Sequence, residues 1–325
     1  MKAIVCNEYG APSSLTLEDV PSPVVASGHV GVMVKAAGVN FPDLLVIQDR
    51  YQNRLTPPFT PGCEVAGVVT TVGDGVSDYS IGDRVCARVP HGAFAEQIAV
   101  KVDYRLASIP DGVDFETAAA FPLAYGTSCH ALKDRARLQS GETLLVLGAS
   151  GGVGMAAVQL GKLMGARVIA CASSPEKLAT CRQHGADDVI NYETENLRDA
   201  INHLTGGKGV DVICDPVGGK HAEPALRSMA WRGRYCVIGF TAGDIPQIPI
   251  NLVLLKGCSI VGVSGGGNAR NDPTEYITNQ AQMLAWMSAG KLRPVVTARY
   301  PLARTAEALE LMLKRGMHGK AVILI

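Results

Sequence analysis

Apolar positions in the first third of the chain come in short runs that turn residues interrupt. Between residue 1 and about residue 120 these runs are rich in valine and glycine, and examples are Val30–Val34, Gly67–Val72 and Asp83–Ala87. Short β-type runs at such spacing are typical of a mostly-β domain. We therefore expect short strands over this part of the chain.

From about residue 143 to residue 264 the pattern changes, and strand-like runs alternate with helix-like segments. The predicted strands cover residues 143–147, 167–172, 188–192, 210–214, 234–239 and 259–263, with helices at 153–164, 175–184 and 222–229. This alternation predicts an α/β fold with a doubly wound parallel sheet. The tail returns to a mixed pattern and ends in a predicted strand, Lys320–Ile325.

Composition supports a folded chain of roughly two domains at about 150 residues each. The chain has 325 residues, of which 47% are hydrophobic and 18% are charged. Its 30 basic and 30 acidic side chains cancel. No strong net field therefore favours nucleic acid or an anionic membrane surface.

Neither a signal peptide nor a membrane span is expected. The first residues lack an apolar core of the length that a secretory signal needs. The longest uncharged run, 143–161, has 19 residues, but it holds four glycines within positions 148–154. It is better interpreted as strand, phosphate loop and helix. The nine cysteines occur singly with no C-x-x-C pair, which favours a reducing compartment and a cytoplasmic protein.

The strongest local motif follows the run Leu144–Leu147. The loop continues as Gly148, Ala149, Ser150, Gly151, Gly152, Val153 and Gly154, and an apolar-faced helix comes next. This is a dinucleotide fingerprint with alanine in the first glycine position, in which Gly151 allows close approach of a pyrophosphate and Gly154 allows close helix packing. The alternative is an ordinary tight turn.

The residues that distinguish NAD from NADP are expected at the end of the second predicted strand, 167–172. An acidic residue there would hold the ribose of NAD, but the chain has Ser173, Ser174 and Lys177 instead. Hydroxyl and ammonium groups can donate hydrogen bonds to a 2′-phosphate, so we predict NADPH. In the alternative interpretation a serine caps the next helix and Lys177 is solvated.

Taken together, these motifs resemble the zinc-free quinone oxidoreductase, or zeta-crystallin-like, branch of the medium-chain dehydrogenases/reductases. The resemblance rests on residues 37–43, 61–69, 81–85, 125–128, 148–154, 189–192, 215–218 and 319–322. It implies a GroES-like, mostly-β catalytic domain formed by residues 1–122 and 265–325. A Rossmann NADPH-binding domain would occupy residues 123–264.

The resemblance also makes metal use testable by residue type. Zinc alcohol dehydrogenases of the superfamily place Cys where this chain has Asn40 and His where it has Cys63, and they carry four closely spaced cysteines where this chain has only Cys86. A catalytic zinc needs about three protein ligands. We therefore expect no catalytic or structural zinc. Cys63 is expected to be either a buried small side chain or a reactive thiol.

Without a Lewis acid, hydride transfer to an already activated acceptor is the expected chemistry. Quinones and α,β-unsaturated carbonyl compounds are such acceptors, and the sequence does not choose between them. Asn40 and Tyr51 are the candidate catalytic residues: the resemblance places Asn40 beside the nicotinamide ribose and the loop Gln48–Tyr51 over the active-site cleft. The alternatives are that Asn40 caps the turn before Pro42 and that Tyr51 only packs. The loop also has Asp49 and Arg50 where a glycine is expected before the tyrosine.

Further cofactor contacts follow from the matched motifs. Tyr192 is expected beside the adenosine, and Lys320 is expected either near the nicotinamide or as a surface charge. The remaining candidates follow the Tyr125–Gly126 step or end the last two strands: Thr127, Ile238, Gly239, Phe240, Val263 and Ser264. Residues 265–272 are expected to form a polar loop.

The resemblance implies a homodimer through the edge strand of the Rossmann sheet, since an exposed edge invites pairing. Two other readings remain open. One is an NADPH-binding protein with little catalysis, like the lens crystallins and RNA-binding relatives of this branch. The other is a zinc alcohol dehydrogenase.

Overall fold

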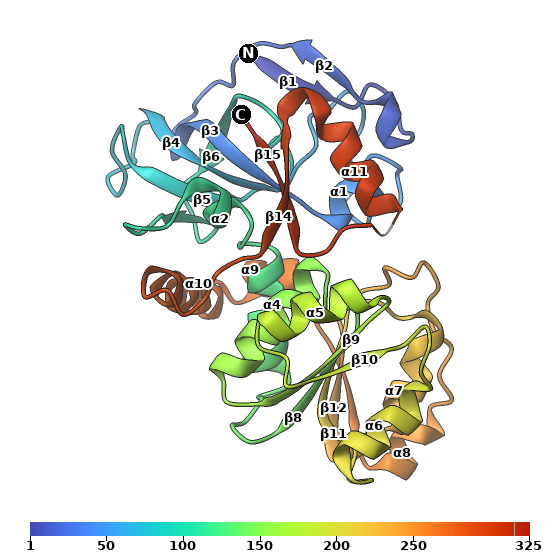
Figure 1. Cartoon of the computed structure of the whole chain (residues 1–325). Coiled ribbons are helices and arrows are strands. Elements are labelled where there is room, and N and C mark those ends of the chain that lie inside the picture. The colour runs from blue at the N-terminus through green and yellow to red at the C-terminus, as the bar shows by residue number, and fades with distance from the viewer. Residues whose placement is uncertain (315) are drawn as a thin grey trace. The chain divides into compact units, whose positions relative to one another are not determined.

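The computed structural model describes residues 1–314 and 316–325 (Figure 1). The chain divides into two compact units, and the boundaries fall at Leu123 and Arg270. Unit 1 comprises residues 1–123 and 271–325, and unit 2 comprises residues 124–270. Both ends of the chain therefore belong to unit 1, and unit 2 is inserted between them.

Unit 1 is mostly β-structure. Its strands are β1 (Lys2–Val5), β2 (Thr16–Asp19), β3 (His29–Val39), β4 (Glu64–Val72), β5 (Arg84–Arg88), β6 (Gln97–Lys101), β7 (Leu106–Ser108), β14 (Val296–Pro301) and β15 (Lys320–Leu324). Its helices are α1 (Phe41–Val46), α2 (Phe115–Ala119), α10 (Pro273–Ser288) and α11 (Thr305–Leu313). The runs predicted at 30–34, 67–72 and 83–87 thus fall within β3, β4 and β5 or overlap them, which confirms the β-rich assignment.

The main sheet of unit 1 joins the two ends of the chain. Its strand order is β14-β15-β3-β4-β5-β7, and β6 also pairs with β3. The C-terminal strand β15 runs antiparallel to β3, with Val322 opposite Gly38. Alternating apolar residues such as Val32, Val34 and Val65 are buried beneath this sheet. Residues nearly 300 positions apart are therefore neighbours where β3 ends.

Unit 2 contains a six-stranded sheet in which all strands are parallel. The strands are β8 (Thr143–Val146), β9 (Arg167–Ala172), β10 (Asp188–Asn191), β11 (Val210–Asp215), β12 (Met229–Val237) and β13 (Ser259–Gly262), in the order β10-β9-β8-β11-β12-β13. The order reverses direction between β8 and β11, which places a switch point at the carboxyl end of β8. This topology confirms the predicted doubly wound sheet.

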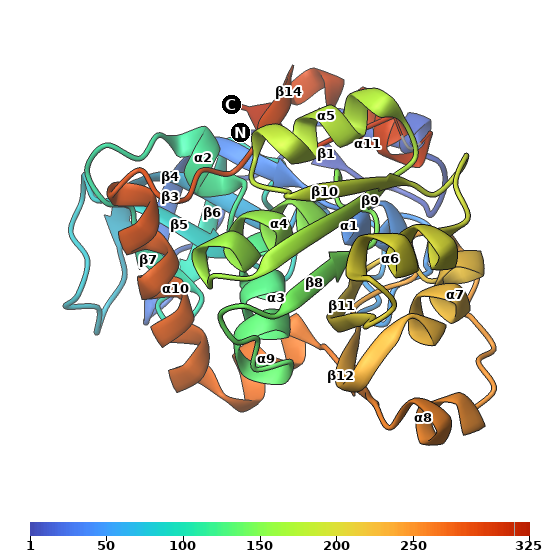
Figure 2. The same ribbon diagram turned by 60° about the horizontal axis from the view of Figure 1, so that its bottom comes forward.

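Helices cover both faces of this sheet, as Figure 1 and Figure 2 show. The α-helices of unit 2 are α3 (Ala124–Cys129), α4 (Gly152–Leu163), α5 (Pro175–Gln183), α6 (Leu197–Thr205), α7 (Ala222–Arg227), α8 (Asn251–Lys256) and α9 (Gly265–Asn271, whose last residue belongs to unit 1). Helices α4 and α5 lie on one face, and α6, α7 and α8 lie on the other. The central strands β8, β9 and β11 are almost entirely buried between them, as parallel strands are, whereas the edge strand β13 is largely exposed.

Two expectations about individual segments have clear outcomes. The 19-residue uncharged run forms β8, a loop and most of α4, and no helix in the described part of the chain has the length and apolar character that a membrane crossing requires. The loop expected at 265–272 is wrong, because residues 265–271 form α9. The Ser264 hydroxyl accepts a hydrogen bond from the amide of Gly267 at 3.2 Å, and Ala269 is buried. Capping and burial offset the poor helix propensity of three glycines.

Candidate functional site

On unit 2, the glycine-rich loop leads from β8 into the start of α4. Gly151 is the N-cap of α4, so the amides of Gly152, Val153 and Gly154 have no intrahelical partner. A Cβ on Gly154 would lie 2.2 Å from the carbonyl oxygen of Gly148. Only glycine therefore allows the helix to begin this close to the strand.

Two further residues fix the form of this loop. Ala149 donates its amide proton to the carbonyl of Cys171 on β9 at 2.9 Å, and Ser150 is buried. The loop is thus held to the sheet while the amides at the helix start remain available. A helix N-terminus in this setting suits the pyrophosphate of a dinucleotide.

The residues predicted to bind the 2′-phosphate lie close together at the end of β9, the second strand of the unit 2 sheet along the chain. Ser174 is the N-cap of α5 and accepts a hydrogen bond from the amide of Lys177, at 3.4 Å. The ammonium group of Lys177 donates to the hydroxyl of Ser173 at 3.1 Å. Ser174 therefore caps α5, as the alternative interpretation expected. The Ser173 hydroxyl and the Lys177 ammonium nevertheless lie together at the end of the strand.

Tyr192 comes directly after β10 and packs against a residue that the sequence analysis did not select. Its ring lies 4.3 Å from the ring of His221, centroid to centroid, with an interplanar angle of 36°. His221 is buried, and burial lowers the pKa of its imidazole. The two rings form an aromatic wall beyond β10. The sequence around His221 contains no motif that would predict its contact with Tyr192.

The other candidates on unit 2 lie where the strands end or in the first helix. Thr127 is buried in α3, while Ile238, Gly239 and Phe240 follow β12, and Val263 and Ser264 follow β13. All of the strand-end residues are at the carboxyl side of the parallel sheet, where folds of this type bind ligands.

On unit 1, Asn40 occupies the junction between β3 and α1. It is the N-cap residue of α1, and its backbone amide donates to the carboxylate of Asp43 at 2.8 Å. Its side chain is 5% exposed. The capping role and a role at the site are therefore compatible, since the backbone serves the helix start.

The Asn40 side chain contacts both members of a buried ion pair, Glu64 and Lys320. The ammonium of Lys320 donates to the Asn40 Oδ1 atom at 2.6 Å, to the Glu64 Oε2 atom at 2.8 Å and to the Val39 carbonyl at 3.1 Å. The Asn40 Nδ2 atom donates to the same Glu64 oxygen at 2.6 Å. Glu64 and Lys320 are almost completely buried, so these bonds compensate the desolvation of both charges.

These hydrogen bonds determine which way the Asn40 carboxamide is oriented. Its oxygen faces an ammonium group, and its nitrogen faces a carboxylate, which fixes the orientation of the amide. The ammonium of Lys320 has all three donors directed at oxygens within unit 1. We therefore interpret Lys320 as a residue that positions Asn40 rather than as a direct contact of the cofactor.

The donor set in this region does not fit zinc. The oxygens of Asn40 and Glu64 that could approach a cation already accept hydrogen bonds from Lys320. Burial, together with Asp43 and Glu64, raises the pKa of the Cys63 thiol well above its usual value, whereas zinc binds the thiolate. A protonated thiol, together with oxygens that already accept hydrogen bonds from an ammonium group, makes a poor metal site.

Tyr51 lies in the loop that follows α1. Asp49 in this loop has φ = 54°, the left-handed conformation that glycine adopts most easily and that aspartate tolerates better than most residues. The missing glycine of the motif is thus replaced by an aspartate in the conformation that a glycine would favour. Burial raises the pKa of the Tyr51 hydroxyl, so it carries its proton at neutral pH.

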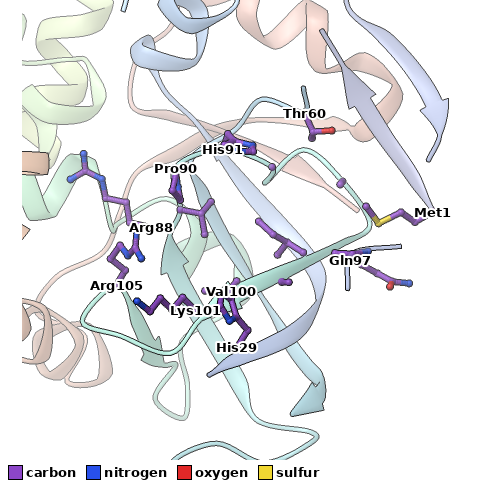
Figure 3. Close-up of a pocket in the computed structure, with 16 residues that line it drawn as sticks. Met1, His29, Thr60, Arg88, Pro90, His91, Gln97, Val100, Lys101 and Arg105 are labelled. Atoms are coloured by element: carbon purple, nitrogen blue, oxygen red, sulfur yellow. The ribbon is translucent and has the colours of Figure 1, made fainter. Parts of the chain in front are cut away.

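A separate cavity of about 480 Å³ is present in unit 1 (Figure 3). Its lining includes His29, His91, Lys101 and Arg105. Neither Asn40 nor Tyr51 nor Lys320 lines it. The cavity is therefore separate from these three residues, but Arg88, which the β4–β5 ladder places directly opposite Glu64, also lines it. Its Arg105 is already paired with Asp103.

Both parts of the chain match known protein families. Residues 26–111 match the family model described as alcohol dehydrogenase GroES-like domain, and residues 152–282 match the one described as zinc-binding dehydrogenase. The chain is 38% identical to quinone oxidoreductase-like protein 2 homolog of Nematostella vectensis, over 99% of this chain and 88% of that protein. It is 35% identical to the quinone oxidoreductase of Rattus norvegicus, over 100% of this chain and 98% of that protein.

Solved structures agree with these relatives. The Escherichia coli quinone oxidoreductase complexed with NADPH superposes with a TM-score of 0.92 at 27% identity, and all of both chains is covered. Mycobacterial Rv1454c complexed with NADPH gives a TM-score of 0.93 at 31% identity, again over both whole chains. The similarity extends to both units, which confirms the GroES-like and Rossmann assignments.

Burial of Asp43 generates a testable pH dependence. Desolvation raises the pKa of this carboxyl to about 7, so the folded protein binds a proton more tightly than the unfolded chain does. Stability from this group is then present below pH about 4 and is lost as the pH rises towards 7. Between these pH values, we expect wild type to lose stability relative to Asp43→Asn, measured by urea unfolding. A constant difference across this range would contradict the assignment.

Proposed function

This chain belongs to the zinc-free quinone oxidoreductase family of medium-chain dehydrogenases/reductases, and we propose that it reduces quinones or other α,β-unsaturated carbonyl compounds with NADPH. In the net reaction a hydride and a proton reach the acceptor, which is reduced by two electrons, and NADP⁺ is released. When bound, the nicotinamide supplies the hydride. The protein then has to hold both reactants and supply or admit the proton.

The observation that carries this proposal is the network of Asn40, Glu64 and Lys320. A lysine ammonium and a fixed amide occupy the region where zinc enzymes of the superfamily place metal ligands. An acceptor bound there is not polarised by a metal ion, so it has to be electrophilic already. Quinones and enones meet this condition because hydride addition leaves a delocalised oxyanion that is readily protonated.

The two candidate residues on unit 1 take different roles in this proposal. The amide nitrogen of Asn40 is committed to Glu64, so Asn40 serves the site as a hydrogen-bond acceptor through its Oδ1 atom, for a hydroxyl such as that of the nicotinamide ribose. Tyr51 keeps its proton and acts as the donor to the acceptor's oxygen.

On unit 2, the start of α4 is proposed to hold the pyrophosphate, with Ser173, Ser174 and Lys177 on the 2′-phosphate. Tyr192 is proposed to lie beside the adenosine. The hydrogen bond between Lys177 and Ser173 supports this assignment because it places a positive charge at the strand end, where the chain lacks an acidic residue. Two structural neighbours were solved with NADPH.

We also propose a homodimer that forms through the β13 edge of unit 2. Exposed apolar side chains gather in this part of the unit: Trp231, Ile245, Ile250, Leu254, Leu255 and Ile260. β13 is the last strand of the described sheet and pairs with β12. A second copy would cover these side chains and extend the sheet, which is the usual way to protect such an edge.

The first experiment is NADPH oxidation, followed by absorbance, with purified protein and a panel of acceptors. The panel contains benzoquinone, phenanthrenequinone, an enone, an alkenal and crotonyl-CoA, with NADH as the control donor. Turnover of quinones or enones supports the proposal. The preferred acceptor then decides between a quinone reductase and a double-bond reductase. Tight NADPH binding with no turnover of any acceptor would favour a binding protein instead.

Removing the hydroxyl of Tyr51 tests its role as donor. Tyr51→Phe keeps the ring and is expected to lower kcat by about tenfold or more, in the range typical of a lost proton donor. The dissociation constant for NADPH is expected to stay the same, since the Tyr51 hydroxyl is not among the proposed contacts of the cofactor. Unchanged kcat would assign Tyr51 to packing.

Shortening Lys177 tests the choice of cofactor. Lys177→Ala removes a charged contact to the 2′-phosphate, which is typically worth 1.5–3 kcal/mol, so roughly a 10- to 100-fold loss of NADPH affinity is expected. NADH, which lacks this phosphate, should bind almost as before. Equal losses for both nucleotides, measured by titration calorimetry, would refute the assignment.

A charge on the exposed apolar surface tests the dimer. Leu254→Glu is expected to convert a dimer into monomers in light-scattering measurements at micromolar concentration, because burying an unpaired carboxylate in an interface is costly. Ile277→Glu on α10 is the matched control, since Ile277 is an exposed apolar residue of unit 1. A monomeric wild type would contradict the proposal.

A further inference from the structure

Arg88, at the end of β5, lies on the same sheet face as the Asn40 network. The β4–β5 ladder places it directly opposite Glu64, and the β3–β4 ladder places Glu64 opposite Gly38. Residues directly opposite each other in an antiparallel pair point to the same face. Arg88 is thus in the row of residues that ends at the predicted site, and no sequence motif pointed to it.

The charge of Arg88 has no counter-ion in the part of the chain that the structure describes. Glu64, its cross-strand neighbour, is committed to Lys320, Asn40 and the amide of Leu123. No described carboxylate lies within 4.0 Å of the Arg88 guanidinium. Two other arginines of unit 1 differ, since Arg105 pairs with Asp103 and Arg84 donates to the Val113 carbonyl.

Besides Glu64, three protonated side chains are within the electrostatic influence of Arg88, and two of them, Tyr51 and Cys63, belong to the predicted site. Burial raises the pKa of Tyr51, of Cys63 and of Tyr276, and the positive charge of Arg88 opposes the rise in each of them. Its guanidinium therefore acts on the proposed proton donor and on the thiol beside Asn40. Arg88 also lines the cavity of Figure 3, where its side chain lies on the opposite side of the view from Met1 and Gln97.

Arg88 is a half-buried residue near three uncharged groups, and no described carboxylate pairs with it to offset the cost of its desolvation. Its planar fork matches a carboxylate, to which it can donate two parallel hydrogen bonds. We propose that Arg88 binds a carboxylate of the acceptor, so that the natural substrates are activated carbonyl compounds carrying an anionic group. This inference rests on the proposed function and narrows its substrate class.

The test compares two acceptors in which a carboxylate replaces a methyl group, and it follows how Arg88→Gln changes the ratio between them. 4-Oxopent-2-enoate and pent-3-en-2-one share the same enone, and only the first carries a carboxylate. Wild type is expected to favour the acid in kcat/KM by roughly tenfold or more, the value expected for one charged hydrogen-bonded contact. In Arg88→Gln this preference should disappear through a higher KM for the acid, with kcat and the ketone little changed.

Two controls separate this role from others. Lys101→Gln removes an exposed charge from β6, which pairs with β3 and not with β5, and should leave the preference intact. The thermal midpoint and the NADPH dissociation constant of Arg88→Gln should equal those of wild type. Equal losses for both acceptors, or a preference that survives in Arg88→Gln, would overturn the proposal.

A binding measurement keeps this test independent of turnover. Calorimetric titration of the reduced compounds, 4-oxopentanoate and pentan-2-one, into the NADP⁺-saturated protein should show that only the acid loses affinity in Arg88→Gln. If the acceptor panel shows no turnover, the proposed reaction fails, and this titration still decides whether Arg88 binds a carboxylate. No difference between the acid and the ketone in wild type would refute the role of Arg88.

Discussion

The buried carboxylate of Glu64 is the contact on which the organisation of unit 1 depends. It accepts hydrogen bonds from Lys320 on β15, from Asn40 at the end of β3 and from the amide of Leu123, the last residue before unit 2 begins. Two charges in a nearly dry interior are costly, and only complete hydrogen bonding makes them tolerable. Glycine at position 38 leaves room for this carboxylate, because a Cβ there would lie 2.4 Å from a Glu64 oxygen.

Because of this network, the two ends of the chain have to meet before the site is formed. Lys320 reaches Asn40 only when β15 pairs with β3, so the orientation of the amide depends on the complete sheet. The same arrangement fills the metal-binding region with an ammonium group. In the proposed function, this ion pair is the reason why the acceptor has to be activated already, since the Asn40 and Glu64 oxygens that face Lys320 are not free to bind a metal.

The units contribute different parts of the chemistry. In unit 2 the free amides of α4 and the polar tip of β9 are local features, formed by residues within about 30 positions of one another. In unit 1 the polar side chains come from β3, β4, β5, β15 and the loop after α1. In the proposed function, the local features of unit 2 hold the cofactor and the side chains of unit 1 select the acceptor.

This difference explains what each level of analysis determined. The sequence by itself determined the alternating strands and helices of unit 2, the glycine loop and the cluster of Ser173, Ser174 and Lys177, because these depend on short-range periodicity and on backbone geometry. Only the tertiary structure decided that Lys320 is buried against Asn40, that Tyr192 stacks on His221 and that Arg88 lies in the row of Glu64. Strand pairing and burial join residues far apart in the chain, and no local pattern records such contacts.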